Sequence, residues 1–323
     1  MSTLDGRVPH RLRTLGTLEL TGPDGAPVPA HRRELLLLAY LAGRRGRAES
    51  RGTLATLLWE DREEARARGS LRQALFRLRK AIPDALTLDG ETVALRPDGL
   101  HTDVEEMERH AAAGALDAAI AAWGGEFLGG EEPGEGSALR EWADGERARV
   151  RAAFARVLER RLALLEASGD AATAIPDAER LVALDPLDAG ATERLASALR
   201  RAGDPAAALR ALDALAARRR AELGSGLPPR LTALAESVRG EVAAREAEGA
   251  RAALRQSAAG NAVPADARGR VLAAWRHVAD GADPVLLVEA RDGDAADVLD
   301  ALLDAAAADD AVVLAARGYP ADR

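Results

Sequence analysis

Basic residues between Arg66 and Lys80 form the part of the chain best suited to binding an anion. Six arginines and lysines occur there, and no acidic residue separates them. Leu71, Leu75, Leu78 and Ile82 follow the i, i+4, i+7, i+11 spacing of the buried face of a helix. The spacing therefore predicts one helix over residues 63–82 whose other side carries positive charge. In an acidic protein, such a helix indicates an anionic partner, and DNA is the expected one.

The predicted basic face offers groups that hydrogen-bond DNA. Residues early and midway along this helix are the main expected contacts: Arg66, Arg68, Arg72, Gln73 and Arg77. The arginines are expected to contact phosphates or base edges, and Gln73 is expected to read adenine. Arg79 and Lys80 come late in the helix, which favours phosphates. Weaker phosphate candidates outside the helix are Arg32, Arg33 and Arg96.

Phe76 lies on the same face, and two interpretations stay open for it. It contacts a thymine methyl group, or it packs under the hairpin that follows; packing is preferred. The alternative for all the basic residues of this helix is a solvated face that binds no partner.

Charge is spread unevenly along the 323 residues. The net charge is −8, but residues 7–99 hold 17 basic against 12 acidic side chains, so the remainder carries −13. An acidic remainder repels DNA, which favours one localised contact surface over general coating.

Other kinds of chemistry have little support in the sequence. The chain has no cysteine, and its five histidines show no metal-ligand spacing. We therefore expect no enzyme activity, no metal and no cofactor. Three tryptophans are expected to pack rather than bind ligands: Trp59, Trp123 and Trp142. With neither a signal peptide nor a membrane-length apolar run, a cytoplasmic location is expected.

The elements around the basic helix predict a winged helix-turn-helix over residues 10–100. Residues 11–29 alternate as strands do and include the turn residues of 22–25. Helices are expected over residues 32–42 and 50–59, with Ser50 as N-cap of the second. After the basic helix, Asp89-Gly90 marks a hairpin over residues 86–95. The strands begin near Arg11, so we expect no receiver domain and no control by aspartyl phosphorylation.

Residues 101–248 are predicted to be helical. Leu165–Asp170 recurs as Leu199–Asp204 at an offset of 34 residues, the period of tetratricopeptide helix pairs. Pro176 is expected to kink its helix unless it lies near the start, and Asp103 is expected to cap the first helix of the region. Residues 124–136, rich in Gly and Glu, are expected to form a surface loop. Residues 249–268 are interpreted as a linker, and residues 269–323 as a β-α-β fragment.

Positions 11–248 resemble bacterial transcriptional activator domain regulators, a family that includes the Streptomyces antibiotic regulatory proteins. The resemblance rests on segments from both predicted domains: residues 15–20 (LGTLEL), 57–59 (LLW), 71–79 (LRQALFRLR), 102–104 (TDV), 141–142 (EW), 184–188 (LDPLD) and 222–224 (ELG). It implies an OmpR-like winged helix that binds promoter DNA through its third helix. It also implies a tetratricopeptide-like domain for dimerisation or regulation, with RNA polymerase as a further expected contact.

The tail resembles the entry to signal-transduction NTPase domains, through residues 271–275 and 285–289. Where a phosphate loop should follow, residues 290–297 lack the Gly-Lys-Ser/Thr signature, and Asp292, Asp294 and Asp297 would repel an anion. We therefore expect a degenerate remnant that binds no nucleotide, in a chain that ends before a complete NTPase could form.

The expected fold is mainly α and multidomain: a winged helix, an all-α tetratricopeptide-like domain and a short α/β fragment. The expected function is sequence-specific regulation of transcription, as an activator that binds double-stranded promoter DNA as a homodimer. The alternatives are a tetratricopeptide scaffold without DNA binding and, opposed by the missing phosphate loop, an ATP-driven switch.

Overall fold

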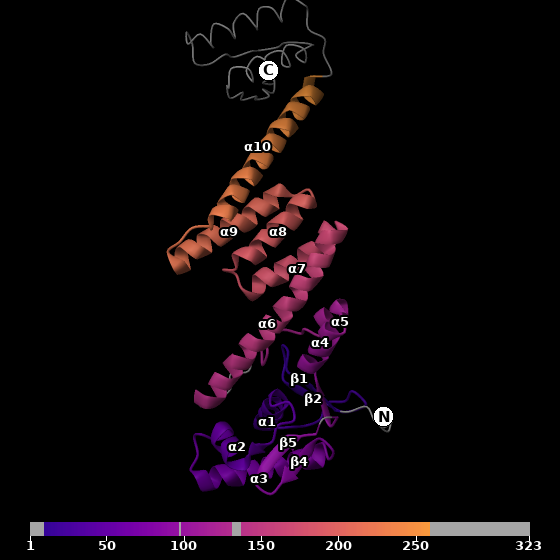
Figure 1. Ribbon diagram of the computed structural model, residues 1–323, viewed down its shortest axis with the longest axis vertical. Helices are drawn as coiled ribbons and strands as arrows, with labels where there is room; N and C mark the ends of the chain where they lie inside the picture. The colour runs from indigo at the N-terminus through magenta and orange to yellow at the C-terminus, as the bar shows by residue number, and fades with distance from the viewer. Residues whose placement is uncertain (1–9, 97, 131–136, 259–323) are drawn as a thin grey trace, which may run out of the picture. The chain divides into compact units, whose positions relative to one another are not determined.

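A computed structural model describes residues 10–96, 98–130 and 137–258 (Figure 1). The N-terminal part contains, in chain order, β1 (His10–Arg13), β2 (Glu19–Thr21), α1 (Arg32–Gly43), β3 (Glu49–Ser50), α2 (Arg51–Leu58), α3 (Glu64–Ala81), β4 (Leu86–Asp89), β5 (Thr92–Leu95) and β6 (Leu100–Thr102). The helices that follow are α4 (Asp103–Ala112), α5 (Leu116–Ala121), α6 (Ser137–Ser168), α7 (Ala171–Leu184), α8 (Ala189–Arg201), α9 (Pro205–Leu223) and α10 (Pro229–Ala258).

The predicted winged helix is confirmed. Helices α1, α2 and α3 pack on one another, and β4 and β5 form the antiparallel hairpin that was expected at Asp89-Gly90. The short strand β3 joins this hairpin through β5. Ser50 is the N-cap of α2, since its hydroxyl accepts a hydrogen bond from the Thr53 amide at 3.0 Å.

The strands of the expected N-terminal sheet are shorter than the alternating pattern predicts. Strand β1 ends at Arg13, and residues between it and β2 leave the ladder. The third strand of this sheet, β6, was not predicted: it pairs with β1 in parallel, with Leu12 opposite Thr102. Three residues are too few for a periodic signal, so only tertiary pairing reveals β6.

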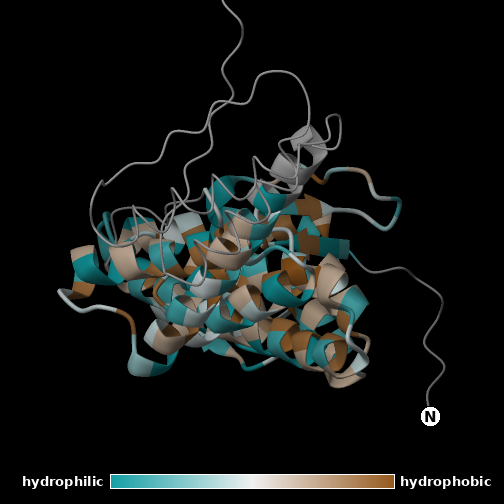
Figure 2. Cartoon of the chain, turned by 90° about the horizontal axis from the view of Figure 1, so that it is seen from above, coloured by the Kyte–Doolittle hydropathy of each residue, from teal (hydrophilic) through white to brown (hydrophobic). Residues whose placement is uncertain are grey.

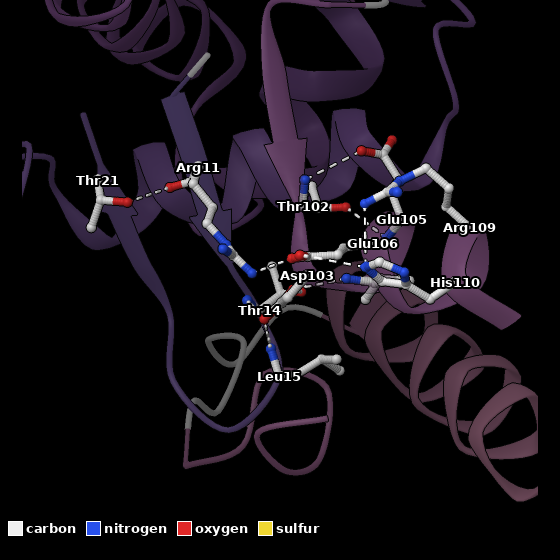
Figure 3. Close-up of polar contacts among 11 residues, drawn as sticks. Arg11, Thr14, Leu15, Thr21, Thr102, Asp103, Glu105, Glu106, Arg109 and His110 are labelled. Atoms are coloured by element: carbon white, nitrogen blue, oxygen red, sulfur yellow. Dashed lines mark hydrogen bonds and ion pairs between the residues drawn. The ribbon is translucent and has the colours of Figure 1, made fainter. Parts of the chain in front are cut away.

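Asp103 joins this sheet to α4 (Figure 3). Its carboxylate accepts hydrogen bonds from the Thr14 and Leu15 amides, both at 2.8 Å, and from the Thr14 hydroxyl at 2.7 Å. The expectation that Asp103 caps the helix is wrong. Thr102 is the N-cap and forms a capping box with Glu105, while Asp103 is the first helical residue and only 4% exposed.

Residues 124–130 are not the simple surface loop that their composition predicts. Phe127 and Leu128 are buried, and the Leu128 amide donates to the Thr14 carbonyl at 2.7 Å. Gly16, at a φ of +86°, lies so close to Gly124 that a Cβ atom would come within 2.4 Å of the Gly124 carbonyl oxygen. Glycine is therefore needed here for close backbone packing rather than for a loose loop.

Aromatic contacts extend this junction to the long helix α6. The Trp142 ring lies edge-on to Tyr40 of α1, with centroids 5.1 Å apart, and to Phe127 at 5.9 Å. Burial, together with nearby Glu49, raises the pKa of Tyr40. Trp123 stacks on Phe154 at 4.1 Å, so both tryptophans pack, as expected.

The 34-residue repeat is visible as a repeated turn. The Asp170 amide donates to the Leu165 carbonyl at 3.0 Å, and the equivalent Asp204 amide donates to Leu199 at 2.9 Å. Gly169 and Gly203 occupy positive φ in the two turns. Equivalent apolar positions are also buried in both copies: Ala174 and Ala208, Ala178 and Leu212, Leu181 and Leu215. The mainly α fold with helical repeats is thus confirmed, and hydrophobic residues alternate with hydrophilic ones along the helices (Figure 2).

Two compact units divide the described helices. Elements β1 to α8 lie in one unit with the later part of α9, and α10 lies in the other with residues 205–210. The first ten residues of the predicted linker, 249–258, are the end of α10. The remainder of the linker and the β-α-β fragment lie outside the described residues, and the predicted domain boundaries stay predictions. Within the described helices, none is long and apolar enough to cross a membrane.

Replacing Asp103 with Asn should destabilise the protein. An amide turns one of the two oxygens into a donor, so either the Thr14 and Leu15 amides or the Val104 amide would face a donor instead of an acceptor. Each buried donor left without a partner costs about 1–3 kcal/mol. Urea unfolding followed by circular dichroism measures the change. Glu159→Gln, the same chemical change on an exposed residue of α6, should leave the free energy of unfolding unchanged. Equal stability of the two variants would contradict the role given to Asp103.

Candidate nucleic-acid interface

Helix α3 has the two faces that the sequence predicts. Leu71, Leu75 and Leu78 are at most 3% exposed, and Ile82, just past the last turn, is completely buried. Ala67 and Ala74 complete the buried stripe. Since these side chains pack against α1 and α2, the opposite side of the helix faces solvent.

The exposed side contains most of the predicted contact residues. Arg72, Gln73, Phe76, Arg79 and Lys80 are all exposed. Within the part of the chain that the structure describes, Arg72, Arg79 and Lys80 form no ion pair with another residue. Their charges are thus directed to solvent.

The preferred interpretation of Phe76, packing under the hairpin, is wrong. Its side chain is 71% exposed, the largest value among the exposed large apolar residues of the described chain. The hairpin core is filled instead by Val93, Leu86 and Leu95. An aromatic ring is left in the middle of a basic face.

Arg66 and Arg68 meet acidic residues that precede them in sequence. Arg68 pairs with Glu64 at 2.6 Å, and the Arg66 Nε atom lies 3.9 Å from Glu63. All four side chains are more than 60% exposed. Exposed pairs of this kind contribute at most about 1 kcal/mol, so they restrain the two arginines only weakly.

Arg77 is held differently, by the buried carboxylate of Glu34 on α1. The Arg77 Nε atom donates to one Glu34 oxygen at 2.5 Å, and the His31 amide donates to the other at 2.9 Å. Glu34 is only 3% exposed, whereas the Arg77 side chain is 46% exposed. Sequence reasoning treated Arg77 as one more DNA contact and missed Glu34, because 43 residues separate the pair.

A depression lies between the start of α1 and the middle of α3. One carboxylate, that of Glu34, lines it together with four arginines: Arg32, Arg33, Arg62 and Arg77. Arg62 donates to the Ser70 hydroxyl at 2.8 Å, and Arg33 lies 3.4 Å from Asp61 and over the Trp59 ring. The weaker candidates Arg32 and Arg33 therefore come together with α3, although about thirty residues separate them from it in sequence.

Arg96 follows β5 at the end of the wing and is exposed. Its amide donates to the Ala85 carbonyl at 2.9 Å, which fixes the backbone at the base of the hairpin. Trp59 is 4% exposed and belongs to the core, as expected. Among the described residues no group of His, Asp and Glu side chains is arranged to hold a metal ion.

Comparison with known proteins identifies similarity to a domain in the region that follows the wing. The family model of the bacterial transcriptional activator domain matches residues 98–239. No curated protein sequence matches the chain. Mycobacterium tuberculosis EmbR, solved in complex with a low-affinity phosphopeptide, has a similar structure with a TM-score of 0.53.

The similarity to EmbR covers 73% of this chain at 23% sequence identity, and it establishes a shared fold. The chain spans 65% of the EmbR chain. The family model begins just before β6 and ends in α10, so it covers the helical region behind the winged helix. Residues 98–239 of the chain are therefore similar to a bacterial transcriptional activator domain.

Proposed function

We propose that the protein regulates transcription by binding promoter DNA with the exposed face of α3. The observation that carries this proposal is the solvent-facing set of Arg72, Gln73, Phe76, Arg79 and Lys80 on the third helix of a winged helix. In helix-turn-helix proteins the corresponding helix enters the major groove, where Gln reads adenine and basic residues bind guanine or phosphate. In this proposal Arg66, Arg68 and Arg96 bind phosphates on either side.

The match of residues 98–239 to a bacterial transcriptional activator domain supports the regulatory part of the proposal. A bacterial transcriptional activator domain behind the winged helix favours an activator. We propose that this helical domain joins two protomers on DNA or contacts RNA polymerase, and that the protein performs no catalysis. A helical-repeat scaffold without DNA binding is the competing function, and the experiments below separate the two.

Replacing Arg72, Arg79 and Lys80 together with Ala should weaken binding to DNA and make it less sensitive to salt. A duplex selected by the wild-type protein from a random library serves as the ligand, and fluorescence anisotropy measures Kd across a salt series. Each lost phosphate contact reduces the slope of log K against log salt by about 0.9, or about 2.7 for three. Between 50 and 200 mM salt, the wild-type protein should therefore lose roughly 40-fold more affinity than the triple variant.

The matched control changes three exposed arginines of α6 and α9, Arg156, Arg210 and Arg218, to Ala. It removes the same charge and should keep the wild-type slope. If both triple variants lose affinity equally, net charge and not the face of α3 is responsible. Failure of the wild-type protein to select any duplex would favour the scaffold.

Phe76 should contribute sequence specificity through the methyl group of a thymine. Replacing single thymines of the selected duplex by deoxyuridine removes only this methyl group, and loss of one buried methyl costs about 0.8 kcal/mol, or about fourfold in Kd. At one position the wild-type protein should show this loss and Phe76→Ala should not. A wild-type protein insensitive to every such replacement would exclude the contact.

A further inference from the structure

We propose that the depression between α1 and α3 is a phosphodiester site that binds successive phosphates of one DNA strand through Arg77 and Arg62. This inference deepens the proposed function and rests on it. It assigns Glu34, a residue that does not face DNA itself, the role of positioning Arg77. It also gives Arg77 a role separate from reading bases.

Arg77 is oriented by Glu34. Glu34 engages the Nε atom of its guanidinium, so the two terminal nitrogens are left for another acceptor. Glu34 cannot shift to follow Arg77, because its second oxygen accepts the His31 amide at 2.9 Å and its side chain is buried. A planar guanidinium held at one nitrogen is preorganised and loses less rotamer entropy when it binds an anion.

Arg62, which lines the same depression, is also held by a hydrogen bond at one nitrogen. Its Nη1 atom donates to the Ser70 hydroxyl at 2.8 Å, and Ser70 in turn donates to the Arg66 carbonyl at 2.9 Å. Ser70 and Arg77 both line the depression and lie two helical turns apart, about 10 Å along α3. Arg62 and Arg77 therefore approach the same depression from positions spaced along the helix.

The charge of the lining favours an anion. Glu34 pairs with Arg77 and Asp61 lies beside Arg33, whereas Arg62 donates to the neutral hydroxyl of Ser70. The positive end of the α1 dipole adds to this potential, because Arg32 and Arg33 are its first residues. A polyanion is the ligand that this surface fits. The depression borders Gln73 on the exposed face of α3, so a DNA strand is favoured over a separate anionic ligand.

The site also explains why a buried carboxylate occurs under a DNA-binding face. Alone, the Glu34 charge would repel phosphate and destabilise the fold. Paired with Arg77, it serves as a fixed acceptor that aims the guanidinium. Two roles for Arg77 then make different predictions: binding phosphate, or merely neutralising Glu34.

Single methylphosphonates distinguish these roles. Each duplex carries one uncharged backbone position in the sequence selected by the wild-type protein, and anisotropy measures Kd for the full chain. At one or two adjacent positions the wild-type protein should lose affinity several-fold. Arg77→Ala should bind more weakly overall and be insensitive at one of those positions, whereas Arg156→Ala should keep the wild-type pattern.

The Glu34→Gln background completes the test. If Arg77 binds phosphate, Arg77→Ala should lower affinity in the Glu34→Gln protein as well, and the salt slope should fall by about 0.9. If Arg77 only neutralises Glu34, the double variant should regain wild-type affinity, and the proposal is overturned. Urea unfolding of each variant identifies any loss of affinity that comes from misfolding.

Failure of this inference is separable from failure of the proposed function. A wild-type protein that binds its selected duplex tightly, with every methylphosphonate effect unchanged by Arg77→Ala, would refute the phosphodiester site and leave DNA binding intact. A wild-type protein that selects no duplex would refute both.

Discussion

Burial of the apolar stripe of α3 is the constraint on which the rest of the candidate interface depends. Leu71, Leu75 and Leu78 pack into the core formed with α1 and α2, and a helix has only one rotation that buries all three. That rotation places Arg72, Phe76 and Lys80 in solvent. The direction of the basic face is therefore a consequence of hydrophobic packing, and no polar contact is needed to set it.

The polar contacts have a different role, which is to fix individual side chains within that frame. Glu34 restrains Arg77, and Ser70 restrains Arg62. Arg72 and Arg79 are exposed and carry no such restraint among the described contacts. The candidate interface thus has arginines held by hydrogen bonds at one edge, and arginines without such bonds among the described contacts at its centre.

The winged helix is tied to the helical region through packed backbone rather than through a flexible tether. Asp103 accepts hydrogen bonds from two amides just after β1, and Gly16 and Gly124 bring two chain segments into direct contact. A chain of ion pairs continues the junction, from Arg45, just after α1, through Glu108 on α4 to Arg149 on α6. These contacts fix the winged helix against α4 and α6.

The local pattern of the sequence determined the helices, the hairpin, the repeated turn and the two faces of α3. Each depends on residues within a few turns of one another, where period and capping chemistry are visible. Strand β6, the buried part of the Gly-rich segment, the role of Asp103 and the pairing of Glu34 with Arg77 were decided only by tertiary structure. They join residues 43 to more than 100 positions apart. Phe76 shows the same limit: periodicity placed it opposite the core, but only the packed hairpin, with its interior already filled, left the ring exposed.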